Sequence, residues 1–137
     1  MSRLYLDASC IIYYLVEASS PFHAAVVARV ARHGADPESR ILTSRLSLLE
    51  CRTRPLKEAD SRLLAAYDEF FGTRRLTLAD VSDRVIERAT ELRARHGFRT
   101  PDAIHLATAI EERADLVLTG DVTLRRCSEV AVEVVEP

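Results

Sequence analysis

The sequence has no tryptophan, one lysine, four glycines and three cysteines in 137 residues. Cys10, Cys51 and Cys127 are odd in number, lie far apart and form no CxxC spacing, so neither a disulfide framework nor a zinc knuckle is indicated. Neither GxGxxG nor GxxxxGK(S/T) occurs, which leaves dinucleotide and Walker-type nucleotide binding without support. No apolar run approaches the ~20 residues that span a bilayer, and no signal peptide is evident. We therefore expect a cytoplasmic protein with three buried thiols and no membrane segment.

The length is close to the commonest size of a single domain, and 47% of the residues are hydrophobic. We expect one domain over residues 1–137. Short apolar runs predict strands at residues 4–6, 41–43, 76–78, 116–118 and 132–135. Helical patterns lie between them, at residues 7–15, 21–33, 44–55, 60–71, 80–97 and 100–112. This alternation predicts an α/β fold with a central, mainly parallel five-stranded sheet.

The helical patterns also predict which residues begin helices and which face the core. Ser44 is expected to cap its helix and Pro55 to end or kink it; Asp80 or Ser82 begins a later helix, and Thr100 is an expected N-cap. The predicted core positions of two helices are Phe22, Val26, Val27 and Val30 in one, and Val85, Ile86, Ala89 and Leu92 in the other.

Three aspartates, Asp7, Asp102 and Asp121, stand where a helix is expected to begin after an apolar run or a loop. The carboxyl ends of parallel strands lie along one edge of a sheet, so these carboxylates are expected to meet in space. Taken singly, an aspartate in such a position more often serves as a helix cap, which contributes about 1 kcal/mol.

Glu50 does not fit the capping explanation. It lies between Leu46 and Thr53 on the apolar side of its predicted helix, and a buried carboxylate needs a partner. An ion pair with Arg54 is one explanation. A divalent cation is the other, because several oxygen ligands around Mg²⁺ or Mn²⁺ relieve the repulsion among clustered carboxylates.

The charge distribution suits an anionic substrate once a cation is bound. The net charge of −2 argues against nucleic-acid binding through bulk positive charge. Without Asp7, Glu50, Asp102 and Asp121, 17 acidic residues (21 less 4) remain against 19 basic ones. All basic residues but Lys57 are arginines, whose planar fork suits phosphate, although the codon bias of a GC-rich genome explains this preference equally well.

Four segments carry a resemblance that covers essentially the whole chain: residues 4–9 (LYLDAS), 47–50 (SLLE), 100–109 (TPDAIHLATA) and 116–121 (LVLTGD). In this order they resemble the PIN domains, and within them the VapC-type toxins of VapBC toxin–antitoxin pairs. The resemblance implies a PIN-like three-layer α/β/α sandwich and an endoribonuclease that depends on Mg²⁺ or Mn²⁺. It further implies that the protein is the toxin of a type II toxin–antitoxin system, is blocked by a cognate VapB-like antitoxin, and forms a homodimer.

By matching position, the resemblance makes Asp7, Glu50, Asp102 and Asp121 the catalytic, metal-holding acids, with Ser9 and Thr119 in supporting positions. On chemical grounds the three aspartates are expected to contact metal directly or through water, and Glu50 to position the metal or the attacking water. The predicted contacts to RNA phosphates are Arg45, Arg52 and Arg99, although solvated helix faces explain these arginines nearly as well.

Two alternatives accompany this hypothesis. His105 falls one turn after Asp102, as a general base or ligand would, but its helix is otherwise apolar, and we interpret it as a packed side chain with a satisfied nitrogen. The rival function is a catalytically silent PIN-like module that docks to an antitoxin or to RNA. The intact acids argue against that rival.

Overall fold

The structure is a computed structural model that describes residues 2–16 and 18–137; Met1 and Glu17 lie outside the described residues. A five-stranded sheet runs through its centre in the order β3-β2-β1-β4-β5, and every neighbouring pair is parallel. The strands are β1 (Arg3–Leu6), β2 (Arg40–Ser44), β3 (Leu76–Ala79), β4 (Leu116–Thr119) and β5 (Val132–Val134). Each predicted strand is therefore present, and the parallel sheet is confirmed.

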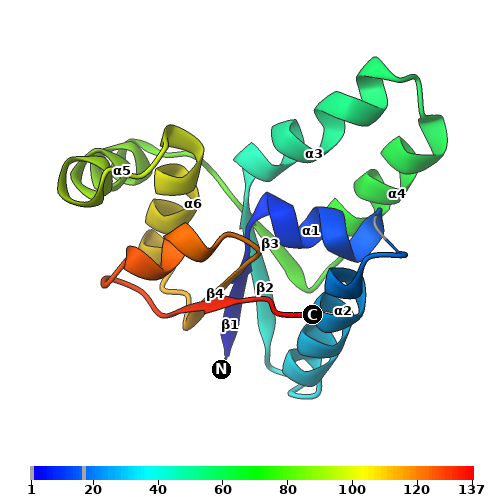
Figure 1. The fold of residues 1–137 in the computed structure, drawn as a ribbon, viewed down its shortest axis with the longest axis horizontal. Helices are drawn as coiled ribbons and strands as arrows, with labels where there is room; N and C mark the ends of the chain where they lie inside the picture. Colours follow the sequence, from blue (N-terminus) through cyan, green and yellow to red (C-terminus); the bar gives the residue numbers. More distant parts are fainter. Residues whose placement is uncertain (1, 17) are drawn as a thin grey trace.

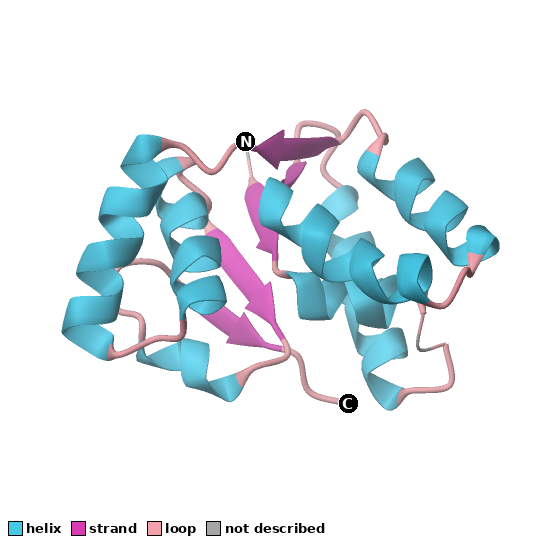
Figure 2. Ribbon diagram, turned by 90° about the horizontal axis from the view of Figure 1, so that it is seen from above, coloured by secondary structure: helices cyan, strands magenta, loops and turns pink. Residues whose placement is uncertain are grey.

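Helices cover both faces of this sheet. They are α1 (Ala8–Leu15), α2 (Pro21–Gly34), α3 (Arg45–Lys57), α4 (Ser61–Phe71), α5 (Asp83–His96) and α6 (Thr100–Glu111), with an unpredicted 3-10 helix, η1 (Val122–Arg126). Figure 1 shows α5 and α6 on one side of the sheet, and α1 and α2 on the other, with α3 and α4 projecting as a hairpin; Figure 2 gives the view from above. The three-layer α/β/α arrangement is confirmed. In residues 2–16 and 18–137, no helix combines the length and apolar character needed to cross a bilayer.

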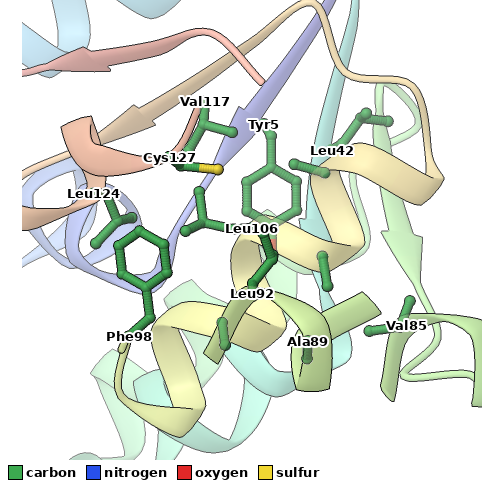
Figure 3. Close-up of a cluster of buried hydrophobic side chains, with 13 residues drawn as sticks. Tyr5, Leu42, Val85, Ala89, Leu92, Phe98, Leu106, Val117, Leu124 and Cys127 are labelled. Carbon is green, nitrogen blue, oxygen red and sulfur yellow. The ribbon is translucent and has the colours of Figure 1, made fainter. Parts of the chain in front are cut away.

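The sheet separates two hydrophobic clusters because successive strand side chains point to opposite faces. Tyr5 and Val117 pack with α5 and α6, around Leu106 and Leu92, and Figure 3 shows these side chains converging. Leu4, Leu6 and Leu118 point the other way and pack with α1, α2 and the apolar sides of α3 and α4.

The helix boundaries confirm some predicted caps and correct others. Ser44 caps α3 by accepting a hydrogen bond from the backbone N–H of Leu46 at 3.0 Å. Ser82, not Asp80, caps α5. Thr100 is not the N-cap of α6: Arg99 occupies that position without a side-chain cap, and Thr100 is the first helical residue.

Three predicted positions differ in the structure. Val27 is 38% exposed and Ile86 is 47% exposed, because the buried faces of α2 and α5 are narrower than the apolar pattern suggested. In α5 the contact with α6 is made by the face that carries Val85, Ala89 and Leu92, and Ile86 lies beside it. Pro55 does not end α3; it is buried within the helix, which ends two residues later at Lys57.

The turn before β5 is tied to the end of α5 by Glu129. Its carboxylate accepts hydrogen bonds from Arg95 Nη1 at 2.6 Å and from His96 Nε2 at 2.9 Å. Burial acts to raise the pKa of Glu129, but hydrogen bonds from His96 and Ser128 outweigh it and lower that pKa to about 2. The ionised form of this carboxylate therefore stabilises the fold.

Replacing Leu92 by alanine is expected to lower the free energy of unfolding by about 2–5 kcal/mol, because a cavity replaces a side chain packed between α5 and α6. Leu92 is 1% exposed and Ile86, on the same helix, is 47% exposed. Ile86→Ala is the matched control and is expected to cost below about 1 kcal/mol. Urea denaturation measures both values, and equal losses would contradict the assigned faces of α5.

Glu129→Gln is expected to destabilise the protein near neutral pH and to have less effect as the pH falls. The folded-state pKa of Glu129, about 2, is below its ordinary value of 4.5, so the carboxylate's contribution is present above that ordinary value and is lost as the pH approaches 2. Urea denaturation of both proteins across this pH range tests the expectation. A stability deficit that stays constant down to the acid end would show that the charge of Glu129 is unimportant.

Candidate active site

The pairing of β1 with β4 brings the first and last of the four acids to one edge of the sheet. These strands run in parallel with Leu6 opposite Leu118. Asp7 follows β1 directly, and Asp121 is the second residue after β4. Their side chains therefore emerge at the same carboxyl edge, as the sequence predicted.

Asp7 is 6% exposed, and hydrogen bonds fix both of its carboxylate oxygens. Ser9 Oγ donates to Oδ1 at 2.6 Å, and Thr119 Oγ1 donates to Oδ2. The oxygen of Thr119 in turn accepts from the backbone N–H of Asp121 at 3.0 Å, so one hydroxyl joins the carboxylate of Asp7 to the backbone of Asp121. Oδ1 also accepts from Cys10 N at 3.1 Å, which means that Asp7 caps α1 in addition to lying in the cluster.

Asp121 likewise combines two roles. Its Oδ1 accepts from the backbone N–H and the hydroxyl of Thr123, both at 2.9 Å, and so caps η1. The capping explanation from the sequence therefore holds for Asp7 and Asp121, but it does not account for their convergence.

Gly120 is a site residue that the sequence analysis did not single out. Its backbone N–H donates to Ser9 Oγ at 3.1 Å. A Cβ atom at this position would lie 2.8 Å from Tyr13 Cε2 and 3.3 Å from Ser9 Oγ. The close approach of α1 thus requires glycine here, and the glycine between the strand end and the acid was the available signal.

Asp102 joins the cluster through Arg99. Arg99 Nε donates to Asp102 Oδ2 at 3.0 Å, and Nη2 lies 3.6 Å from Asp121 Oδ2. The hydrogen bond and the charge of Asp102, with the charges of Asp121 and Glu50, raise the pKa of Arg99 although burial opposes the shift. The Arg99 side chain is 76% exposed, so acids from α6 and the end of β4 share a cation that is free to move.

Glu50 finds its partner on another helix. His105 Nε2 lies 2.6 Å from Glu50 Oε1. The predicted alternative partner, Arg54, pairs instead with Glu58 at 3.0 Å. His105 is 3% exposed and both of its nitrogens are bonded, which agrees with the interpretation of a packed histidine. That one of its partners is Glu50 was not predicted.

The negative charges of Glu50 and Asp7 both raise the pKa of a nearby buried thiol. Burial raises the pKa of the Cys51 thiol to about 12, and the charges of Glu50 and Asp7 add to that shift. Cys10, Cys51 and Cys127 are all free and buried, as predicted. Burial raises the pKa of each, so all three thiols are protonated and poor nucleophiles.

Of the three predicted phosphate contacts, Arg99 lies among the acids. Arg45 pairs with Asp80 at 2.5 Å, and Arg52 lies 3.8 Å from Asp68. Both line a groove between α3 and α4, whose other lining residues include Leu48, Leu49, Thr53, Leu56 and Leu64. Among the described residues, the ion pairs of Arg45 and Arg52 are thus with acids outside the four candidate site residues.

The four candidate ligands at this site are all carboxylates, the type of ligand that hard divalent cations prefer. Asp102 and Asp121 already share one cation, the guanidinium of Arg99. Within the described residues, no three His, Cys, Asp or Glu side chains lie close enough to hold one ion between them. An ion shared by three of these acids would therefore require their carboxylates to approach one another and Arg99 to withdraw; the exposure of Arg99 permits its own movement.

The chain matches the PIN domain family over residues 4–130. No curated protein matches it in sequence. Among solved structures, VapBC2 from Rickettsia felis, bound to a promoter DNA fragment, is similar with a TM-score of 0.74 and 19% identity over 97% of this chain and 99% of that chain. VapBC-1 from nontypeable Haemophilus influenzae is similar with a TM-score of 0.70 and 16% identity over 96% of this chain and 97% of that chain.

VapC20 from Mycobacterium tuberculosis, described as a sarcin-ricin loop cleaving toxin, gives a TM-score of 0.65 and 19% identity over 83% of this chain and 86% of that chain. At such identities the similarity shows the fold alone. The family match, by contrast, extends over almost all of the sequence from the first strand onward. The chain therefore belongs to the PIN domain family.

Proposed function

We propose that this protein is a metal-dependent endoribonuclease that hydrolyses RNA phosphodiester bonds and acts as the toxin of a type II toxin–antitoxin system. The observation that carries the proposal is the convergence of acids at the carboxyl edge of the sheet. Thr119 joins the Asp7 carboxylate to the backbone of Asp121, and Arg99 joins the carboxylates of Asp121 and Asp102. Carboxylates gathered in this way suit a divalent cation and an anionic substrate.

The structural relatives support the same assignment. The proteins from Rickettsia felis and Haemophilus influenzae are VapBC assemblies, and a similar structure from Klebsiella pneumoniae is described as a toxin–antitoxin complex. The Mycobacterium tuberculosis protein is described as a cleaving toxin. Together with family membership, these likenesses favour a toxin nuclease over the catalytically silent module.

Asp7, Asp102 and Asp121 would hold Mg²⁺ or Mn²⁺ directly or through water, and Glu50 would position the ion or the attacking water. The bound ion would polarise the phosphoryl oxygens, lower the pKa of a coordinated water and stabilise the leaving oxygen. Ser9 and Thr119 would keep Asp7 in place, since their hydroxyls donate to its two oxygens. Such outer hydrogen bonds orient the groups that contact a metal.

Arg99 would bind a phosphate of the substrate. Its guanidinium lies between two acids, and a cation bound there would release it toward an approaching phosphate. A planar guanidinium binds phosphate through two parallel hydrogen bonds. Arg45 and Arg52, on α3, would extend the phosphate contacts along the RNA.

The partners follow from the exposed apolar surface of α3. Leu49 is 65% exposed and Leu56 is 70% exposed, and both line the groove between α3 and α4. An amphipathic segment of a VapB-like antitoxin would lay its apolar face in such a groove. We also propose that the toxin forms a homodimer and acts in the cytoplasm, where its RNA substrate is found.

Asp102→Asn is expected to lower the rate of RNA cleavage by at least about 100-fold, the scale on which losing one preorganised electrostatic contact slows an enzyme. Gel analysis of total cellular RNA measures the rate with Mg²⁺, with Mn²⁺ and with EDTA. Wild type is expected to produce discrete fragments with either metal and none with EDTA, because the carboxylates alone do not activate water.

Asp83→Asn is the matched control, since Asp83 is an acid in the first turn of α5 as Asp102 is in the first turn of α6. It removes the same charge from a helix terminus and should leave cleavage unchanged. Cleavage that persists in Asp102→Asn and in EDTA would disprove the assigned site. A folded wild type that cuts nothing but binds an antitoxin would favour the silent module.

Arg99→Ala is expected to weaken the salt dependence of binding to a non-cleaved single-stranded RNA. The slope of log K against log salt should become less steep by about 0.7, the amount for one lost phosphate contact. Fluorescence anisotropy in the Asp102→Asn background measures this slope. Arg84→Ala, which removes an exposed arginine of α5 in a pocket lined by Glu87 and Glu91, is the control. Equal slopes for both variants would show that Arg99 does not contact phosphate.

A further inference from the structure

His105 links the hydrophobic core to Glu50 through two short hydrogen bonds. Its Nδ1 lies 2.6 Å from Tyr5 Oη, and its Nε2 lies 2.6 Å from Glu50 Oε1. Tyr5 is fully buried, the His105 side chain is 4% exposed and that of Glu50 is 29% exposed. A chain of hydrogen bonds therefore runs from β1 through α6 to an acid of α3 at the candidate active site.

The carboxylate of Glu50 assigns a proton to Nε2 of His105, and the Tyr5 hydroxyl lies within donating distance of Nδ1. As a carboxylate, Glu50 can only accept, so Nε2–H is the donor of that bond. Burial, reinforced by the charge of Asp7, raises the pKa of Tyr5 well above its usual value, and the phenol keeps its proton. Nδ1 is the acceptor that the structure provides for this hydroxyl. Each bond of the chain thus has one donor and one acceptor.

The imidazole has little freedom to take another position. The Tyr5 ring meets it edge-on, with centroids 5.8 Å apart and an angle of 66° between the planes. Its neighbours on α6, Ala103, Leu106 and Ala109, are fully buried. Because both nitrogens are already bonded, His105 has no lone pair to offer a metal ion. Its effect on the site must pass through Glu50.

One carboxylate oxygen of Glu50 is available to another partner. His105 binds Oε1, and within residues 2–16 and 18–137 Oε2 makes no hydrogen bond. The charge of Glu50 also contributes to the raised pKa of Arg99, which lies between Asp102 and Asp121. Glu50 is thus bonded through one oxygen to α6, while its charge acts on the arginine that two of the other acids share.

We propose that His105 is a positioning residue: its Nε2–H, held in place by the Tyr5 hydroxyl, fixes Glu50 so that Oε2 faces the cation or the water that the site binds. This inference rests on the proposed function, because it assigns His105 a role toward the metal held by the four acids. A histidine that only filled the core would need no acid at this distance. The two hydrogen bonds also account for the polar ring of His105 among the buried alanine and leucine side chains of α6.

The assigned tautomer can be tested without metal. In the ¹⁵N NMR spectrum of metal-free protein, His105 is expected to show a protonated Nε2 with a slowly exchanging proton, and Glu50→Gln is expected to shift that signal. A proton found on Nδ1 instead would overturn the inference whatever the activity of the protein.

Direct titration with Mn²⁺, followed by electron paramagnetic resonance, tests the role toward the cation. His105→Phe keeps the size of the ring and removes the donor, and it is expected to weaken Mn²⁺ binding by about 10- to 100-fold. His105→Gln carries an amide N–H near the position of Nε2 and is expected to restore most of the affinity. Tyr5→Phe, which removes one hydroxyl, is expected to cause a smaller loss in the same direction.

His33→Phe is the matched control, since His33 is 8% exposed and bonds to Arg40 at the start of β2, at the opposite edge of the sheet. It is expected to bind Mn²⁺ like wild type. The double variant of Glu50→Gln with His105→Phe is expected to bind no more weakly than Glu50→Gln alone, because His105 acts through that acid.

Three outcomes of the Mn²⁺ experiments would also count against the inference. Unchanged Mn²⁺ affinity in folded His105→Phe would overturn the positioning role alone, and so would losses that multiply in the double variant. A wild type that neither binds Mn²⁺ nor cuts RNA would overturn the proposed function, and the positioning role with it. Circular dichroism and thermal melting verify that each variant is folded. If His105→Phe does not fold, Tyr5→Phe and His105→Gln provide the test.

Discussion

The parallel pairing of β1 with β4 is the constraint on which the rest of the site depends. The register that sets Leu6 opposite Leu118 brings Asp7 beside Thr119 and places Asp121 within reach of the same hydroxyl. Backbone hydrogen bonds and the packing of both sheet faces maintain this register, since a slip by one residue would move each strand side chain into the cluster on the opposite face. The placement of the first and last acids is therefore a consequence of how the core is packed.

Acids gathered at one edge repel each other, and the described side chains offset that repulsion with specific donors. Hydroxyls of Ser9 and Thr119 bind Asp7, the guanidinium of Arg99 spans Asp102 and Asp121, and an imidazole binds Glu50. The donors differ in mobility: those on Asp7 and Glu50 are part of the packed structure, whereas Arg99 is exposed and replaceable. The donors thus divide into a packed set on Asp7 and Glu50 and an exposed one on Asp102 and Asp121.

Much of the fold and the site is readable from the sequence, because local patterns decide it. Apolar runs marked all five strands, and acids at strand ends and helix starts marked three of the four carboxylates. The missed features depend on how helices cross. Nothing near Glu50 in sequence indicates His105, 55 residues away, and the exposure of Ile86 follows from which face of α5 packs against α6. Thr100 failed as a cap because Arg99, which turned toward Asp102, takes the cap position.

The central claim is that the carboxylates form one cation site, and a crystal structure of the protein grown with Mn²⁺ tests it most directly. We predict an anomalous difference peak contacted by Asp7, Asp102 and Asp121, directly or through water, with the Arg99 guanidinium withdrawn from between the two acids that it now joins. Crystals saturated with Mn²⁺ in which Arg99 still bridges Asp102 and Asp121, and no peak lies beside Asp7, would contradict the claim.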